Sequence, residues 1–332
     1  MSALAPLVGR TVVDLSQQLP GPFATLLLRS LGARVIKVEP PGGDPGRRID
    51  PPMFARMVAD KEVVTLDLKS ADGRAELHTL AAAADVFLEG FRPGVAERLA
   101  ADRETLARLN PRLVYCSLSG YGASGPLAKE PGHDLNFLAL AGGLPAGTLD
   151  GEALIRVPWV DLAAGTNAAL AILAALLERE ATGEGAYLEM AMLDAAAVWA
   201  NAKPPRPGGE GAYGVFATAD GERVAISVME EDAWLRLCAA FDWEWSTDPE
   251  LATHEGRRAA FERIRARLRE EIAARSLAAV IDLAERHDLG ISRVKELADA
   301  AADPQLATRA IYPRPNVWKP LGGVAGSLPI SV

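Results

Sequence analysis

The sequence predicts an α/β protein: a large domain with a parallel sheet covered by helices, followed by a smaller α+β domain. Two observations support this class. Short β-rich runs alternate with helical patterns over residues 1–200, and a dense Pro/Gly stretch at 203–209 separates them from a hairpin pattern and charged helices. Alternation of the first kind is typical of right-handed βαβ units. With 332 residues, the chain is long enough for two domains of ordinary size.

The β-rich runs of the first part are short and dominated by Val, Leu and Ile. We expect strands at 11–15, 34–39, 63–67, 86–88, 113–117 and 186–190. The helical patterns between them lie at 23–31, 71–83, 106–110, 134–143 and 163–182. Gly32 and Gly183 are placed to end two of these helices. Together these elements make up a predicted large domain at 1–200.

A linker is predicted at 201–211, because no helix or strand passes easily through its run of Pro and Gly. Beyond it, β-rich runs flank the turn signal Asp220-Gly221, which predicts a hairpin. Helices rich in Arg, Glu and Ala follow. The corresponding ranges are strands at 213–217 and 223–228, helices at 256–275 and 277–287, a small domain at 212–305 and a tail at 306–332 that returns to the large domain.

The net charge of −9 argues against a nucleic-acid partner or an anionic membrane, because both need a basic footprint. A local group of Arg and Lys can still hold one phosphorylated cofactor. Cys116 and Cys238 lie among apolar residues and indicate buried thiols in a reducing compartment. The first ten residues lack a secretory pattern, and the apolar run 163–177 is shorter than a membrane span, so we expect a cytoplasmic protein with a buried core helix.

The glycines Gly120, Gly122 and Gly125 match the spacing of a dinucleotide-binding fingerprint. Pro126 follows where that fingerprint opens a helix, so the match is weak and a nicotinamide enzyme is a minor alternative. No metal site is predicted, because His78, His254 and His287 have no second ligand at metal-like spacing.

Three segments carry candidate acid-base residues. His133 and Asp134 lie at a loop-to-helix junction, where Asp134 either caps the helix or takes part in chemistry. Asp161 precedes the longest apolar helix. It either caps that helix or, in a dry site where its pKa would rise, transfers protons or attacks a thioester. Glu230 begins an acidic cluster at a helix start, where at least part of the cluster is structural.

Several motifs in a fixed order resemble the family III coenzyme A transferases and their relatives, the α-methylacyl-CoA racemases. The resemblance runs through nearly the whole chain. Its most specific parts are Gly21-Pro22-Phe23-Ala24, Leu31-Gly32-Ala33, Val35-Ile36-Lys37-Val38-Glu39, Leu66-Asp67-Leu68-Lys69-Ser70, Glu89-Gly90-Phe91-Arg92-Pro93-Gly94, Ser119-Gly120-Tyr121-Gly122 and Gly183-Glu184-Gly185. It implies a large Rossmann-like domain, a smaller α+β domain and a homodimer of two chains threaded through one another as interlocked rings.

The resemblance also implies where coenzyme A lies. Lys69 and Arg92 would lie near its phosphates or adenine, with Leu68 alongside the base, and Tyr121 is assigned to the same site. No cofactor is implied beyond the coenzyme A part of the substrate.

In the transferases of this family an aspartate at the position of Asp161 acts as a nucleophile. The racemases instead combine that aspartate with residues at the positions of His133, Asp134 and Glu230. All four are present, so the sequence predicts an acyl-CoA racemase that exchanges the α-proton of a 2-methylacyl-CoA, with a place in fatty acid metabolism. A CoA-transferase using Asp161 and a non-catalytic acyl-CoA binder are the alternatives.

Overall fold

The computed structural model describes residues 5–144, 157–202 and 209–308. These residues fall into two compact units, of which the first is Met1–Lys203 with Gln305–Val332 and the second is Pro204–Pro304. The predicted α/β class is confirmed, with a parallel sheet in the large unit and a smaller antiparallel sheet in the other. The parts of the predicted linker and tail at 203–208 and 309–332 lie outside the described residues.

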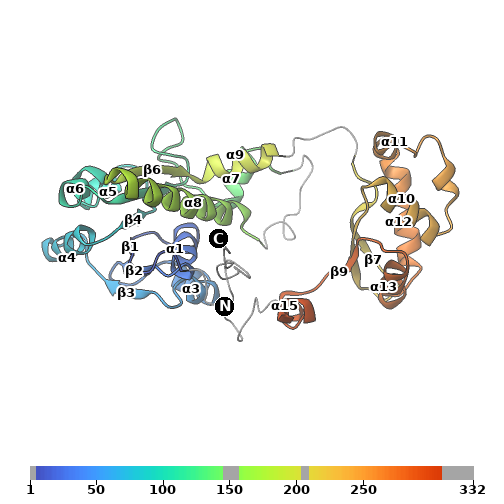
Figure 1. The fold of residues 1–332 in the computed structure, drawn as a ribbon, viewed down its shortest axis with the longest axis horizontal. Helices are drawn as coiled ribbons and strands as arrows, with labels where there is room; N and C mark the ends of the chain where they lie inside the picture. The colour runs from blue at the N-terminus through green and yellow to red at the C-terminus, as the bar shows by residue number, and fades with distance from the viewer. Residues whose placement is uncertain (1–4, 145–156, 203–208, 309–332) are drawn as a thin grey trace, which may run out of the picture. The chain divides into compact units, whose positions relative to one another are not determined.

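A six-stranded parallel sheet forms the centre of the large unit (Figure 1). Its strands are β1 (Thr11–Asp14), β2 (Arg34–Glu39), β3 (Glu62–Thr65), β4 (Val86–Glu89), β5 (Val114–Ser119) and β6 (Ala186–Ala191). Each strand lies within two residues of its predicted bounds. In space the order is β3-β2-β1-β4-β5-β6, which reverses direction between β1 and β4. Open α/β sheets bind ligands outside the carboxyl ends of their strands at such a reversal.

Helices cover both faces of this sheet. Neighbouring side chains of a strand point to opposite faces, and here both sets are apolar, so each face needs a covering layer. Val12 joins one hydrophobic cluster and Val13 the other. Against the first face pack α1 (Pro20–Ser30), α3 (Pro51–Met57) and α8 (Trp159–Thr182), and against the second α4 (Ala71–Ala82) and α6 (Arg103–Leu109). Four further helices of this unit are α2 (Gly46–Ile49), α5 (Val95–Arg98), α7 (Asp134–Leu140) and α9 (Met192–Ala202).

Helix α8 begins four residues before its predicted start and packs against α1 at very short range. A Cβ atom added at Gly165 would lie 2.5 Å from the carbonyl oxygen of Pro20 and 3.1 Å from the Phe23 ring. Length and composition alone would allow α8, with 24 residues, to cross a membrane, but half of its apolar window is buried inside the protein. The prediction of a core helix is consistent with this packing.

Two predicted helices differ in their bounds for identifiable reasons. Helix α6 begins at Arg103 and not at 106, because the Asp102 carboxylate accepts the N–H of Thr105 at 3.0 Å and caps the earlier turn. Helix α1 begins at Pro20 and not at 23, since a proline fits the first helical turn. Helix α9 extends to Ala202, two residues into the predicted linker.

The small unit is an antiparallel sheet packed against helices. The predicted hairpin is confirmed: β7 (Tyr213–Ala217) pairs with β8 (Arg223–Ser227), and Gly221 has the left-handed conformation that the turn needs. The short strand β9 (Ile291–Arg293) adds to β8. The prediction of one helix at 256–275 was wrong, because the chain breaks at Ala260 between two helices. The remaining elements of this unit are α10 (Glu231–Ala240), the 3-10 turn Glu244–Thr247, α11 (His254–Ala259), α12 (Phe261–Ala273), α13 (Leu277–Arg286) and α14 (Leu297–Ala301). Helix α15 (Pro304–Thr308) begins at the last residue of this unit, and its other residues belong to the large one.

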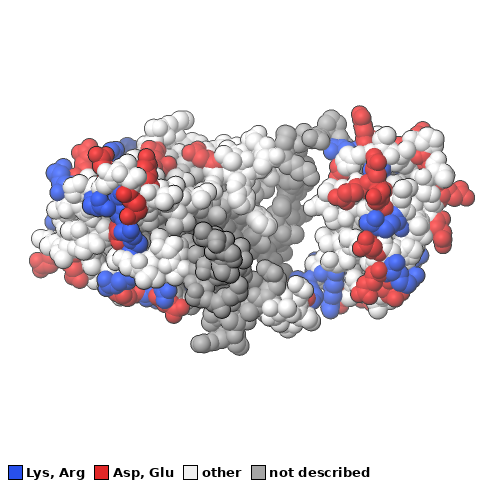
Figure 2. Space-filling view, viewed as in Figure 1, with Lys and Arg blue, Asp and Glu red and all other residues white. Residues whose placement is uncertain are grey.

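The surface carries charged side chains of both signs. On the face shown in Figure 2, basic residues lie among acidic ones, and no broad basic area covers either unit.

Cys116 and Cys238 are both buried and free, as predicted. Burial raises the pKa of the Cys116 thiol to about 12 and that of Cys238 to about 11, so both are held as unreactive thiols.

Candidate active site

A cavity of about 440 Å³ opens at the carboxyl ends of β1, β4 and β5, where the strand order reverses. It combines apolar side chains with a small number of polar ones, as small-molecule sites commonly do. The residues that line it are Ser16, Gln17, Gln18, Pro20, Gly21, Gly90, Phe91, Arg92, Val95, Leu118, Gly120, Glu130, Pro131, Gly132, His133, Asp161 and Met192. Two of the predicted acid-base residues, His133 and Asp161, therefore meet in one cavity although 28 positions separate them in the sequence (161 − 133).

Asp161 is the third residue of α8, so it does not cap this helix. The N-cap position belongs to Pro158. Within the described residues, the Asp161 carboxyl has no hydrogen-bond partner. Burial first, and then the nearby carboxylate of Asp134, raise the pKa of Asp161 from its ordinary 3.8 to about 7. A carboxyl group with this pKa is present in both protonation states near neutral pH and can both give and take a proton.

Of the two roles predicted for Asp134, a cap of its own helix and a part in the chemistry, the first is wrong. The N-cap of α7 is His133, and Asp134 is the first helical residue. Its carboxylate instead accepts the backbone N–H groups of Val160 at 2.7 Å and Asp161 at 3.0 Å. Asp134 therefore caps α8, whose first N–H groups would otherwise lack acceptors, and fixes the position of Asp161.

His133 precedes α7 and contributes to the wall of the cavity with an exposed side chain. Asn136 accepts the backbone N–H of His133 at 3.0 Å, which fixes the start of the helix. Gly132 lies against Phe137 and Tyr121: a Cβ atom at Gly132 would come within 2.8 Å of both side chains. This close packing holds the loop that carries the imidazole.

A second cavity of about 390 Å³ lies at the carboxyl ends of β1, β2 and β3. Lys69 and Leu68 line it, together with apolar residues that could contact a flat base. Gln17 and Phe91 line both cavities, so the two share a wall. Arg92 lines the first cavity and not the second, and Tyr121 lines neither, because its ring packs edge-on against Phe137 at 5.0 Å.

Glu230, the fourth predicted acid-base residue, belongs to the small unit. It is the exposed N-cap residue of α10, and its side chain makes no capping bond. The carbonyl oxygen of the preceding Met229 lies 3.4 Å from both a guanidinium nitrogen of Arg257 and Nδ1 of His254. Helix α11 thus holds the turn on which Glu230 lies.

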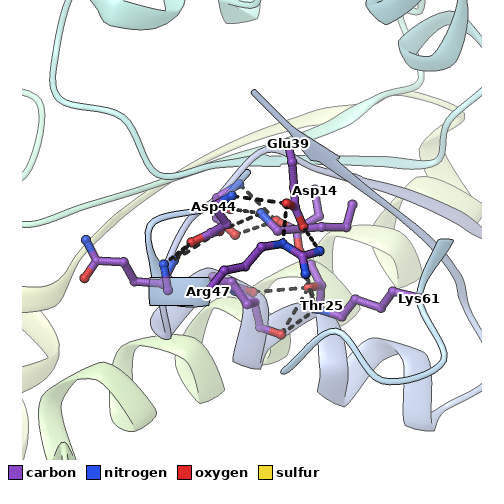
Figure 3. Close-up of polar contacts among 12 residues, drawn as sticks. Asp14, Thr25, Glu39, Asp44, Arg47 and Lys61 are labelled. Atoms are coloured by element: carbon purple, nitrogen blue, oxygen red, sulfur yellow. Dashed lines mark hydrogen bonds and ion pairs between the residues drawn. The ribbon is translucent and has the colours of Figure 1, made fainter. Parts of the chain in front are cut away.

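A group of buried charges next to the first cavity was not foreseen in the sequence. We call Asp14, Lys37, Asp44 and Lys61 the buried charge cluster, since all four side chains are fully buried (Figure 3). The available signal was a charged residue in an otherwise apolar strand, as with Lys37 between Ile36 and Val38. Among the residues that the structure describes, no group of three or more His, Cys, Asp or Glu side chains is arranged to hold a metal ion.

Comparison with known proteins assigns the chain to a family. The sequence profile of CoA-transferase family III matches residues 7–314, which is most of the chain. The chain belongs to CoA-transferase family III. Family III membership makes it an enzyme that acts on acyl-CoA, and both CoA-transferases and acyl-CoA racemases occur among its relatives.

Two curated relatives and one solved structure illustrate the family III likeness. Acetyl-CoA:oxalate CoA-transferase from Acetobacter aceti is 34% identical over 329 residues, which cover 92% of this chain and 84% of that protein. Alpha-methylacyl-CoA racemase from Homo sapiens is 38% identical over 242 residues, 68% of this chain and 62% of the human protein, so the match spans less than two thirds of that racemase. The crystal structure of Rv3272 from M. tuberculosis superposes with a TM-score of 0.81 and 31% identity, covering 93% of this chain and 88% of that one.

Proposed function

We propose that this family III enzyme is an acyl-CoA racemase that inverts the α-carbon of a 2-methylacyl thioester. One observation carries the proposal: an imidazole, His133, and a carboxyl group with a pKa of about 7, Asp161, line the same cavity. Inversion needs a base on one face of the α-carbon and an acid on the other. His133 and Asp161 supply these two groups, and a nucleophilic mechanism would need only the carboxylate.

The proposed roles of the other predicted residues follow from their surroundings. Asp134 holds the N–H groups at the start of α8 and raises the pKa of Asp161, so we assign it to positioning and not to proton transfer. Glu230 is proposed to assist His133, as the resemblance implies. The adenine and phosphates of coenzyme A are proposed to bind in the second cavity at Leu68 and Lys69. Arg92, which lines the first cavity, is proposed to contact the part of coenzyme A that reaches from one cavity to the other. No cofactor is proposed beyond coenzyme A itself.

The test uses a single epimer of a 2-methylacyl-CoA in deuterated water. The proposal expects inversion together with uptake of deuterium at the α-carbon, followed by mass spectrometry and chiral separation of the acid. His133→Asn and Asp161→Asn should each stop exchange with one epimer more strongly than with the other, because each group faces one side of the carbon. Absence of both inversion and exchange in the unmodified enzyme contradicts the proposal.

CoA transfer through Asp161 is a second candidate, which the 34% identity to an acetyl-CoA:oxalate CoA-transferase over 92% of the chain favours. In this reaction the carboxylate attacks the thioester, coenzyme A leaves, and an acyl-enzyme anhydride forms. It predicts ping-pong kinetics and an intermediate that hydroxylamine traps on Asp161. A panel of carboxylic acid acceptors without transfer or trapping excludes it.

We further propose that the enzyme works as a homodimer. Apolar side chains lie exposed on α8 and α9, including Leu177 at 75% and Val198 at 66% exposure. Exposed apolar surface of this kind marks protein contacts. Sedimentation analysis should give twice the mass of the chain, and Leu177→Lys with Val198→Lys should reduce the dimer fraction.

A further inference from the structure

The buried charge cluster contacts the loop that follows β1 through hydrogen bonds to the backbone of Ser16 and Gln18. It contains two ion pairs. Lys37 Nζ lies 3.2 Å from Asp44 Oδ2, and Lys61 Nζ lies 3.5 Å from Asp14 Oδ2. Taking such charges out of water is unfavourable, and apolar side chains of similar volume often stabilise a protein as well or better. A contribution to stability is therefore a poor explanation for this cluster.

The first pair holds the loop by its main chain. Lys37 donates a hydrogen bond to the carbonyl oxygen of Ser16, and Asp44 accepts the N–H of Gln18 at 3.1 Å. Asp44 is itself held by the N–H of Gly46, which it accepts at 2.8 Å. The Lys37–Asp44 pair therefore fixes two backbone groups of the loop, two residues apart.

The second pair holds the two ends of the same loop. Asp14 accepts the N–H of Ser16 at 3.0 Å, and Lys61 donates to the carbonyl oxygen of Pro22 at 2.8 Å. Lys61 also donates to the Thr25 hydroxyl at 2.7 Å, within the first turns of α1. These bonds join the loop to both elements that it connects, β1 and α1.

Gln18 shows what the first pair does to the backbone. Its φ angle is +62°, in the left-handed region that residues other than glycine and asparagine rarely adopt. Such a conformation persists only where the surroundings enforce it. The contact among the described residues that bears on it is the Asp44 carboxylate, whose two oxygens accept the Gln18 N–H at 3.1 and 3.3 Å.

The conformation of this loop matters for the reaction cavity. Ser16, Gln17 and Gln18 line that cavity together with His133 and Asp161, and Gln17 also lines the second cavity. We propose that Lys37 and Asp44 are positioning residues: by holding Gln18 in the left-handed conformation, they fix the wall that the two cavities share. This inference rests on the proposed function only in taking the cavity as the place of reaction.

The first experiment removes the pair as a unit. Lys37→Met with Asp44→Leu replaces both charges by apolar side chains, which leaves no unpaired buried charge and should preserve folding. We expect kcat/KM for α-proton exchange to fall by about 10-fold or more. Adding Gln18→Gly should restore part of the loss, because glycine adopts positive φ without an enforcing contact. A defect that is only structural would not respond to that glycine.

The control is another buried ion pair of the same unit. Arg179 lies 2.6 Å from Asp85 at the opposite end of the sheet and touches neither cavity. Arg179→Met with Asp85→Asn should lower the melting temperature without lowering kcat/KM. If this control loses as much activity as the Lys37/Asp44 variant, or if Gln18→Gly restores nothing, the positioning role is wrong.

A second set of variants tests the conformation with the cluster intact. Gln18→Val disfavours positive φ, whereas Gln18→Asn tolerates it, so the valine variant should lose more activity than the asparagine variant. A crystal structure of Lys37→Met with Asp44→Leu adds a readout that needs no reaction. Gln18 should leave the left-handed region there, and an unchanged φ overturns the inference. Absence of exchange in the unmodified enzyme would contradict the proposed function alone.

Discussion

Asp14 and Asp161 are two buried carboxyl groups of one unit whose surroundings shift their pKa values in opposite directions. At Asp14, burial opposes ionisation, but the charges of Lys37 and Lys61 outweigh it and hold the pKa below its usual range. At Asp161, burial and a neighbouring carboxylate act in the same direction and raise the pKa to about 7. Burial alone therefore does not decide the state of a carboxyl group.

The difference separates a structural group from the group that we propose to react. Asp14 accepts hydrogen bonds from Ser16 and Thr25 and has no access to the reaction cavity. Asp161 lines the cavity and has no hydrogen-bond partner among the described residues. A carboxylate surrounded by hydrogen-bond donors stays ionised, and its oxygens are already engaged in hydrogen bonds. A carboxyl group with few donors that lines a cavity is available for chemistry.

The largest expected effect is on activity at Asp161. Asp161→Asn keeps the shape of the side chain but cannot exchange a proton or attack a thioester. We expect kcat to fall by about 10²–10⁴-fold for proton transfer, and further if an acyl-enzyme forms. Steady-state kinetics measure the loss, and circular dichroism of the same sample should show an unchanged fold. Retained turnover would mean that the reactive carboxyl lies elsewhere.

The next effect is on stability at Asp14. Asp14→Asn leaves Lys61 buried without its charged partner, so the free energy of unfolding should fall by about 3–5 kcal/mol. Urea denaturation measures this change, with Asp161→Asn as the matched control because that carboxyl has no ion-pair partner. Equal stabilities of the two variants would remove the contrast drawn between the two groups.

The pH dependence of stability should distinguish the same two groups. Between the ordinary pKa of 3.8 and about 7, folded Asp161 keeps a proton that the unfolded chain has lost. Its contribution to stability therefore falls as pH rises through this window and is constant above it. Relative to the unmodified protein, Asp161→Asn should gain about 1–2 kcal/mol on going from acidic to mildly alkaline pH, since partial exposure reduces the effect. Denaturation curves that stay parallel across this range would contradict the raised pKa.

The smallest effect is expected at the edge of the buried charge cluster. Arg47 binds Glu39 through two hydrogen bonds of 2.7 Å, but 44% of the arginine side chain is exposed to water. Arg47→Ala should therefore lower the free energy of unfolding by only about 1 kcal/mol. Thermal and urea denaturation are both suited to measure it. A loss as large as that of Asp14→Asn would show that exposure does not separate the two sites.

The fold could be predicted from the sequence to the extent that it depends on local pattern. Strand β2 was predicted at its observed bounds because a short run rich in Val and Ile lies there between Gly32 and Pro40. The hairpin of the small unit followed from Asp220-Gly221. The spatial order of the strands did not follow, since it depends on which strands pair and not on any single run.

Sequence reasoning named two residues that line the candidate cavity, His133 and Asp161, but not the contacts that hold them in place. His133 and Asp161 were found from their sequence neighbours and from the resemblance. The capping of α8 by Asp134 joins positions 26 and 27 residues apart, and the pairing of Asp14 with Lys61 spans 47. Such contacts form only when the sheet and its helices pack together, so no local sequence pattern predicts them. The signs that the sequence offered were charged residues in apolar strands, namely Lys37 within one strand and Asp14 at the end of another.

The tight crossing at Gly165 sets a limit for protein engineering. Any side chain there would press on the Pro20 carbonyl, and the helix that carries Asp161 would have to shift away from α1. A variant designed to bind bulkier acyl groups should therefore carry substitutions in the loops of the cavity, such as at Glu130. The residues at the crossing of α1 and α8 should stay unchanged. Gly165→Ala is therefore expected to displace Asp161 and to disturb the proposed reaction cavity without changing a residue that lines it.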